Sequence, residues 1–197
     1  MHRLLKLLTI VLFATTVQAV EVTDLYQAKV DVLSQAKKDR NHAIQQAMQA
    51  VWLKVGGQKS VLQHEVIKQA LKKYQQYLVQ FSYQNTKNQH LLLARFNEEK
   101  INQLFHQANL PLWGNLRPQV LLWLVQEQGL SREIIAESST AEFPATVQAF
   151  SLQRGLPISL PVMDLTDLNA LSTADVWGRF SAPIAEASAR YQAESYV

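Results

Sequence analysis

The chain contains no cysteine, and this absence excludes several kinds of stabilisation and chemistry. No disulfide can form, so the packed core alone must stabilise the fold. Catalysis by a thiolate, zinc sites with thiolate ligands and iron–sulfur clusters are also excluded, because each of them needs cysteine sulfur. A lipid anchor attached to an N-terminal cysteine is excluded for the same reason.

Sequence signatures of common enzymes and metal sites are missing as well. The serines lack the GxSxG pattern of the hydrolases, and Gly56-Gly57 lacks the glycine spacing of a phosphate-binding loop. The histidines show neither the HxH nor the HExxH spacing of metal sites; they are His2, His42, His64, His90 and His106. We therefore expect no catalytic residue, no metal and no cofactor.

A large excess of charge of one sign is missing too. The chain has 19 basic and 16 acidic residues, and two of the basic ones, Arg3 and Lys6, lie close to the N-terminus. Without these two the net charge is about +1, which predicts no nucleic-acid partner, because such a partner needs a concentrated basic face. Lys68, Lys72 and Lys73 predict at most weak peripheral contact with a membrane.

Residues 1–19 have the pattern of a secretory signal peptide. Arg3 and Lys6 precede the apolar run 7–17, and small residues then mark a cleavage site after Ala19. The run is short for a membrane span, which favours cleavage over a retained anchor. The later apolar run 120–125 is long enough only for a buried strand. The pattern predicts a soluble, periplasmic protein of the cell envelope.

Hydrophobic periodicity predicts a first unit of order β-α-α-β-β-α over residues 20–110. A strand lies within 20–32, and a helix with an apolar stripe runs from Arg40 to Gly56-Gly57. The remaining elements are a second amphipathic helix at 63–78, a hairpin of strands 79–83 and 90–96 around the polar turn 85–88, and a third helix at 98–108. A sheet with helices on one face suits this order.

Residues 111–118 are expected to link the first unit to a second, because two prolines and a glycine interrupt regular structure there. Trp113 is expected to pack where the units meet. The second unit, 119–197, is expected to be a β-α-β-α sandwich-like unit. Its elements are strands at 119–125 and 158–162, a polar loop at 127–142, and helices at 143–154 and 183–191. Because a further strand begins at Ser195, we expect this unit to be cut short at the C-terminus. The predicted fold class is α+β or α/β, in two small units.

A series of short motifs gives the chain a resemblance to a known family. They occur in this order: Arg40 with Ala43, Val55-Gly56-Gly57, Val79-Gln80-Phe81-Ser82-Tyr83, Leu110-Pro111-Leu112-Trp113-Gly114, Arg117-Pro118, Val120-Leu121-Leu122-Trp123, Arg154-Gly155-Leu156-Pro157, Leu160-Pro161-Val162-Met163-Asp164, Asp175-Val176-Trp177-Gly178 and Ala187-Ser188-Ala189-Arg190-Tyr191. On these motifs the chain resembles domain of unknown function 2066, a family of exported gammaproteobacterial envelope proteins. The resemblance implies no activity. It also implies that this chain is a member of the family that is short at its C-terminus.

The segment from Arg154 to Asp164 contains the first candidate site. Asp164 and Asp167 are predicted to follow the carboxyl end of the strand at 158–162, where ligand crevices form in open α/β sheets. Together with Arg154 they could bind a cation or a small molecule, or act as an acid–base pair. A simpler interpretation makes both aspartates helix caps or turn residues.

Trp177 is the second candidate. With Arg179 it could form an aromatic and cationic surface of the kind enriched at protein interfaces, or it could cover the edge of a sheet. Arg190 could pair with Asp164 or with Asp175 and fix the loops. The sequence leaves these alternatives open.

Two functions remain after these exclusions. The first is a non-enzymatic interaction or assembly module with an unknown envelope partner, which the export signal and the missing catalytic signature favour. The alternative is a small-molecule or cation-binding protein, or a hydrolase, that uses a crevice at Asp164 and Asp167.

Overall fold

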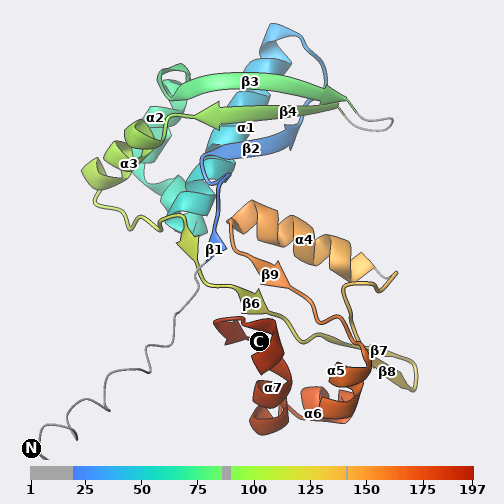
Figure 1. Cartoon of the computed structure of the whole chain (residues 1–197). Coiled ribbons are helices and arrows are strands. Elements are labelled where there is room, and N and C mark those ends of the chain that lie inside the picture. Colours follow the sequence, from blue (N-terminus) through green and yellow to red (C-terminus); the bar gives the residue numbers. More distant parts are fainter. Residues whose placement is uncertain (1–19, 86–89, 141) are drawn as a thin grey trace, which may run out of the picture.

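The computed structural model describes residues 20–85, 90–140 and 142–197. The expected signal peptide with its cleavage site after Ala19, and residues 86–88 of the expected hairpin turn, lie outside the described residues. Helices and small sheets are mixed along the chain, so the fold is α+β. Figure 1 shows two units, which we call the N-terminal unit (20–110) and the C-terminal unit (119–197).

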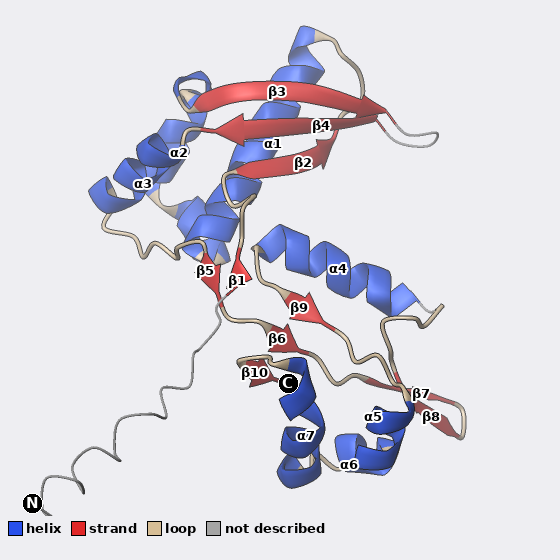
Figure 2. Ribbon diagram, in the orientation of Figure 1, coloured by secondary structure: helices blue, strands red, loops and turns tan. Residues whose placement is uncertain are grey.

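The N-terminal unit is built on an antiparallel sheet of order β2-β4-β3, with β2 at Gln27–Asp31, β3 at Leu78–Asn85 and β4 at His90–Phe96. Helix α1 (Lys37–Gly56) crosses one face of this sheet (Figure 2). Around it lie α2 (Glu65–Lys72), α3 (Glu98–Gln107) and the 3-10 turns η1 (Lys59–Gln63) and η2 (Tyr74–Gln76). The predicted order is confirmed, although the expected helix 63–78 is broken into α2 and η2.

Alternation along the strands decides which face of the sheet α1 covers. Ala28 of β2 and Leu92 and Ala94 of β4 are buried beneath α1, and the residues between them point to the open face. Helix α1 packs there with an apolar stripe spaced three and four residues apart: Ile44, Ala47, Met48, Val51, Trp52 and Val55. Gly57 ends α1 at a φ of 73°, and its N–H donates to the Leu53 carbonyl, as the glycine pair predicts.

The C-terminal unit is centred on a parallel sheet of order β10-β6-β9, with β6 at Val120–Leu121, β9 at Ile158–Ser159 and β10 at Ser195–Tyr196. Helix α4 (Glu142–Arg154) lies between this sheet and the N-terminal unit (Figure 1). Beyond β6 in the same view lie α5 (Leu165–Ala170), α6 (Thr173–Trp177) and α7 (Ser181–Ser188), followed by the turn η3 (Ala189–Tyr191).

Two predictions for the C-terminal unit are wrong in detail. The expected strand 119–125 is interrupted after Leu121, and Val125–Gln128 instead forms β7 of a separate hairpin with β8, Ser131–Ile134. The polar stretch expected as a loop therefore contains strand residues. Gly129 permits the tight turn of this hairpin with a φ of 63°. An exposed hairpin buries little apolar surface, so its hydrophobic pattern is weak.

Residues 111–118 join the units through ordered contacts. Within them β5 (Leu116–Arg117) pairs antiparallel with β1 (Val20–Glu21). Arg117 is fully buried. Its guanidinium donates to the Lys54 carbonyl at 2.9 Å, to the Trp113 carbonyl at 3.0 Å and to the Gly114 carbonyl at 2.6 Å. The link is therefore a packed part of the structure.

The carboxyl end of α1 is capped by groups from later in the chain. The Trp113 N–H donates to the Val55 carbonyl at 2.8 Å, Arg117 donates to Lys54, and Arg154 donates to the Gly57 carbonyl at 2.7 Å. These bonds satisfy carbonyls that a helix end leaves unpaired, and they place two cations at the negative end of the helix dipole. Arg117 and Arg154 thereby hold the C-terminal unit against α1.

Candidate functional site

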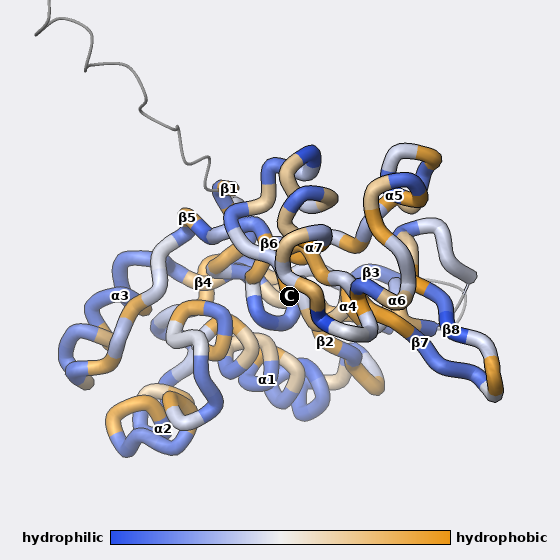
Figure 3. The backbone as a smooth tube through the Cα atoms, turned by 90° about the horizontal axis from the view of Figure 1, so that it is seen from below, coloured by the Kyte–Doolittle hydropathy of each residue, from blue (hydrophilic) through white to orange (hydrophobic). Residues whose placement is uncertain are grey.

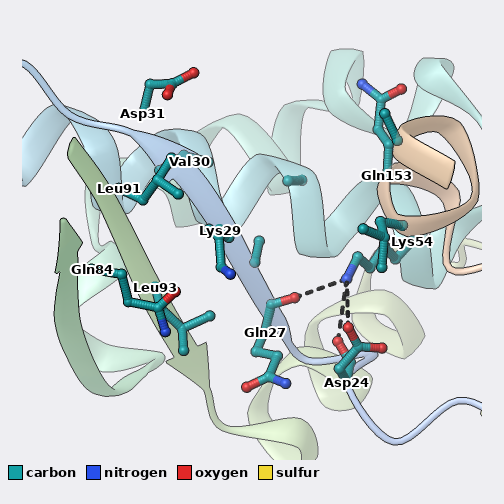
Figure 4. A pocket seen from close by; sticks show the side chains of 14 residues that line it. Asp24, Gln27, Lys29, Val30, Asp31, Lys54, Gln84, Leu91, Leu93 and Gln153 are labelled. Atoms are coloured by element: carbon teal, nitrogen blue, oxygen red, sulfur yellow. Dashed lines mark hydrogen bonds and ion pairs between the residues drawn. The ribbon is translucent and has the colours of Figure 1, made fainter. Parts of the chain in front are cut away.

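A groove of about 650 Å³ lies between the two units, along the outer edge of β2. Its walls come from β2 with the open face of its sheet, from α1 and from α4. The residues that α1 and α4 contribute are Ala50, Lys54, Ala149, Leu152 and Gln153. In Figure 4, Lys54 closes one end of the groove beside Asp24, and Asp31 marks the other end. This is the hollow at the junction of the two units.

The backbone bonds at both ends of β2 show which of its residues face β4. The Phe96 N–H donates to the Tyr26 carbonyl, and the Val32 N–H donates to the His90 carbonyl, each at 2.9 Å. In an antiparallel pair, alternate residues use their backbone groups toward the same neighbour. The even-numbered residues of β2 therefore bond to β4.

The odd-numbered residues of β2 present an edge to the groove. By the same alternation, the backbone N–H and C=O groups of Gln27, Lys29 and Asp31 point away from β4. The Gln27 carbonyl confirms this direction, because it accepts from Lys54 Nζ on the outer side at 3.0 Å. Lys29 and Asp31 border the groove next to it.

Lys54 is a buried amine that fixes the start of β2 to α1. Its Nζ donates to the Asp24 carbonyl at 3.3 Å and to the Gln27 carbonyl at 3.0 Å, and it lies 3.8 Å from the Asp24 carboxylate. Burial lowers the pKa of Lys54, and the Asp24 carboxylate opposes part of that shift. The contacts of the amine are all internal, so it holds the end of the groove in shape.

Helix α4 supplies an apolar wall that is largely uncovered. None of its side chains is buried, and Leu152, which lines the groove beside Ala149, is 57% exposed. A helix of a globular domain normally buries one apolar stripe. Helix α4 therefore keeps apolar surface available beside the groove.

The structure brings three of the predicted site residues together. Arg190 donates to Asp164 at 2.6 and 2.8 Å and to Asp167 at 2.9 Å. Asp164 is also the N-cap of α5 and accepts from two backbone N–H groups of its first turn. The second oxygen of Asp167 accepts from the Met163 N–H and from the Tyr191 hydroxyl. All four carboxylate oxygens thus accept hydrogen bonds from the protein itself.

The electrostatics of this cluster fit a structural brace. Arg190 holds the pKa of Asp164 well below its usual range, and Asp164 raises the pKa of Arg190. Burial and then the hydrogen bond to Asp167 raise the pKa of Tyr191 to about 12. These shifts move all three groups away from neutral pH, whereas an acid–base catalyst needs a pKa near it. The arrangement agrees with the simpler interpretation, in which Asp164 and Asp167 are helix-cap and turn residues. Arg190 bonds to both and connects their loop to the end of α7.

The other two predicted residues lie in different places. Arg154 contacts the end of α1 and does not join the aspartates. Trp177 is 44% exposed, and the Arg132 guanidinium lies 4.0 Å from the centre of its ring. The cation beside Trp177 therefore comes from β8 and not, as we expected, from Arg179. Asp175 forms a capping box with Ser172 at the start of α6 and not a pair with Arg190.

Neither a metal centre nor a membrane-spanning helix is found among the described residues. Within 20–85, 90–140 and 142–197, no group of three or more acidic or histidine side chains is placed to hold a metal ion. Over the same ranges, no helix combines the length and the apolar character that crossing a bilayer requires.

Comparison with known families corrects the resemblance drawn from the sequence. Residues 19–114 match the model of a family described as Domain of unknown function (DUF8605). The resemblance to domain of unknown function 2066 is therefore wrong. The motifs behind it have general structural roles: Val55-Gly56-Gly57 is a helix end, and Arg117 and Arg154 cap that end. The match covers the N-terminal unit and stops just before β5. No curated protein and no solved structure matches the chain.

Sequence reasoning missed the groove. The alternation of Ala28, Lys29, Val30 and Asp31 is a signal for a half-buried strand. It does not tell which neighbour the strand has, so it cannot identify an edge. The approach of α4 depends on contacts between residues about a hundred positions apart, such as Arg154 with Gly57.

Proposed function

We propose that the protein is an exported component of the cell envelope that works by binding a partner protein and not by catalysis. The observation that carries this proposal is the groove between β2 and α4, whose apolar wall is left uncovered. Concave sites with apolar walls and a few fixed polar groups are typical binding sites. The signal-peptide pattern of residues 1–19 supports the location in the envelope.

Apolar residues at the rim of the C-terminal unit also support a binding role. Leu130, Leu165 and Leu168 are exposed. In Figure 3, hydrophobic colour marks α5 and the tip of the β7–β8 hairpin. Each of these exposed leucines offers apolar area that a bound partner could cover.

The test is cross-linking in cells with the tagged chain exported by its own N-terminal segment. Leu152→Glu places a charge on the α4 wall of the groove, and Gln148→Glu places the same charge on an exposed α4 residue that does not line it. We expect one envelope partner to be captured in stoichiometric amount by the original chain and by Gln148→Glu. Capture by Leu152→Glu should fall about tenfold, since a buried unpaired charge costs more than 1.4 kcal/mol. Equal capture by all three chains would contradict the proposal, as would no partner at all.

A further inference from the structure

We propose that the groove binds an extended segment of a partner protein as an added strand alongside β2. This inference rests on the proposed binding function and specifies the chemistry of the partner: a neutral polypeptide in extended conformation with alternating apolar side chains. It also specifies the contacts, which are backbone hydrogen bonds to Lys29 and Asp31.

The unpaired backbone groups of β2 carry the argument. Lys29 and Asp31 each offer an N–H donor and a C=O acceptor toward the groove, and no group of the described residues bonds to them on that side. Donors and acceptors two residues apart on an edge are the template to which another strand pairs. Partner segments commonly bind in this mode, with main-chain bonds giving affinity and side-chain pockets giving selectivity.

The shape of the groove favours an extended chain over a helix. The groove runs from Asp24, which precedes β2, along the strand to Asp31 (Figure 4), and a strand rises about 3.3 Å per residue along such a path. A helix bonds its own backbone internally, so it would leave the groups of Lys29 and Asp31 unpaired. An added strand pairs them and contacts Leu152 of α4 from its other side.

The charges of the groove favour a neutral segment. Its charged side chains are Asp24, Asp31, Lys29 and Lys54, two of each sign, and Lys54 already contacts Asp24. The remaining walls are apolar at Ala50, Ala149 and Leu152. The two charges left over, Lys29 and Asp31, are opposite in sign, so the groove has no net charge that would select a charged segment. Valine-like side chains, in contrast, would bury apolar surface on both walls.

Proline at position 29 gives a selective test of this mode. The Lys29 N–H points into the groove, so Lys29→Pro removes an edge donor without removing a bond of the β2–β4 ladder. Proline is tolerated on edge strands in this situation. Lys29→Ala is the matched control, because it removes the same side chain and keeps the N–H. A melting curve checks that both variants are folded.

The probe is a fluorescein-labelled, capped heptapeptide of alternating threonine and valine, added to the exported, purified chain. We expect binding to raise the fluorescence anisotropy and to slow hydrogen exchange of the Lys29 and Asp31 amides. Lys29→Ala should bind as the original chain does, and Lys29→Pro should bind about fivefold more weakly or not at all. Leu152→Glu, on the opposite wall, should also weaken binding, which keeps the test decisive if proline disturbs folding.

Several results would overturn the inference. They are equal peptide binding by Lys29→Pro and Lys29→Ala, no binding at all, or unchanged exchange at Lys29 and Asp31. A dimer that Lys29→Pro converts to a monomer would also overturn it, because the edge would then pair with a second copy. The in-cell capture experiment separates this inference from the proposed function. A partner lost with Leu152→Glu but kept with Lys29→Pro would leave the function standing and exclude strand addition.

Discussion

The two units are stabilised by different means. In the N-terminal unit a single cluster contains 20 buried apolar residues from α1, the sheet and the helices around it. The corresponding cluster of the C-terminal unit contains six, and the strands of its central sheet pair over only two residues each. Hydrophobic stabilisation increases with the apolar area that is buried. The N-terminal unit therefore contributes the larger share of the hydrophobic free energy of folding.

The C-terminal unit relies more on specific polar contacts. Arg190 and Tyr191 bind the carboxylates of Asp164 and Asp167, and the Trp123 Nε1–H donates to the Ser188 hydroxyl at 2.9 Å. This unit is also held by its contacts to the end of α1. The comparison indicates a rigid unit that carries β2 and a less stable unit that carries α4, with the groove between them.

Removing a large core side chain from each unit should show the difference most strongly. Leu92 in the N-terminal core and Leu171 in the smaller core are both buried, at 0% and 2% exposure. Leu92→Ala should lower the free energy of unfolding by about 3–5 kcal/mol, and the matched Leu171→Ala should lower it by about 2–3 kcal/mol, because the smaller core offers fewer contacts to lose. Urea denaturation followed by circular dichroism measures both. A larger effect at Leu171 would break the comparison.

The junction should respond to loss of Arg117. Its guanidinium makes three bonds to carbonyls, and burial lowers its pKa to about 10. Arg117→Met keeps much of the side-chain volume but leaves those carbonyls unpaired, so the free energy of unfolding should fall by about 2–4 kcal/mol. The control is Arg132→Met, which removes an exposed arginine and should cost at most about 1 kcal/mol. Equal losses in the free energy of unfolding for the two variants would show that the junction contributes little to stability.

Acid should weaken the brace of the C-terminal unit. The pKa of Asp164 lies below its ordinary 3.8 because Arg190 hydrogen-bonds to the carboxylate. A lowered folded-state pKa contributes stability that is present above the unfolded-state value and is lost as the pH falls toward the folded-state value. The melting temperature of the original chain should therefore exceed that of Asp164→Asn at pH 7, and the gap should close below about pH 4. A gap that stays constant down to pH 2 would contradict this assignment.

Trp177 should have the smallest effect on stability. Its ring is half exposed and stacks with Arg132, so Trp177→Ala should cost about 0.5–1 kcal/mol in a urea titration. The sequence also predicts that this residue takes part in partner capture. Unchanged capture by the folded variant would exclude the Trp177 surface and leave the groove.

Strong local patterns allowed much of the N-terminal unit to be predicted. The apolar stripe of α1 and the alternation of β4 each place their element to within a few residues, because burial of one face dictates the spacing of apolar side chains. Gly56-Gly57 marks the end of α1. The C-terminal unit was predicted less well. Its strands are too short for a pattern to emerge, and its β7–β8 hairpin is polar.

The candidate sites also divide into contacts that the sequence suggests and contacts that depend on the tertiary structure. Pairing of Arg190 with Asp164 was one of two predicted alternatives, the other being Asp175, and only the tertiary structure distinguishes them. The cation at Trp177 was assigned to the wrong arginine, since Arg132 reaches the ring from a hairpin that the sequence did not reveal. The groove arises only when α4 docks beside β2, which is a tertiary event.

Native-state hydrogen exchange on the purified protein tests the difference between the units most directly. Amides of α1 and β4 should exchange only through global unfolding, whereas amides of β6, β9 and β10 should exchange through an opening that costs at least about 2 kcal/mol less. The same opening free energy in both units would contradict the account, because the chain would then behave as a single cooperative structure.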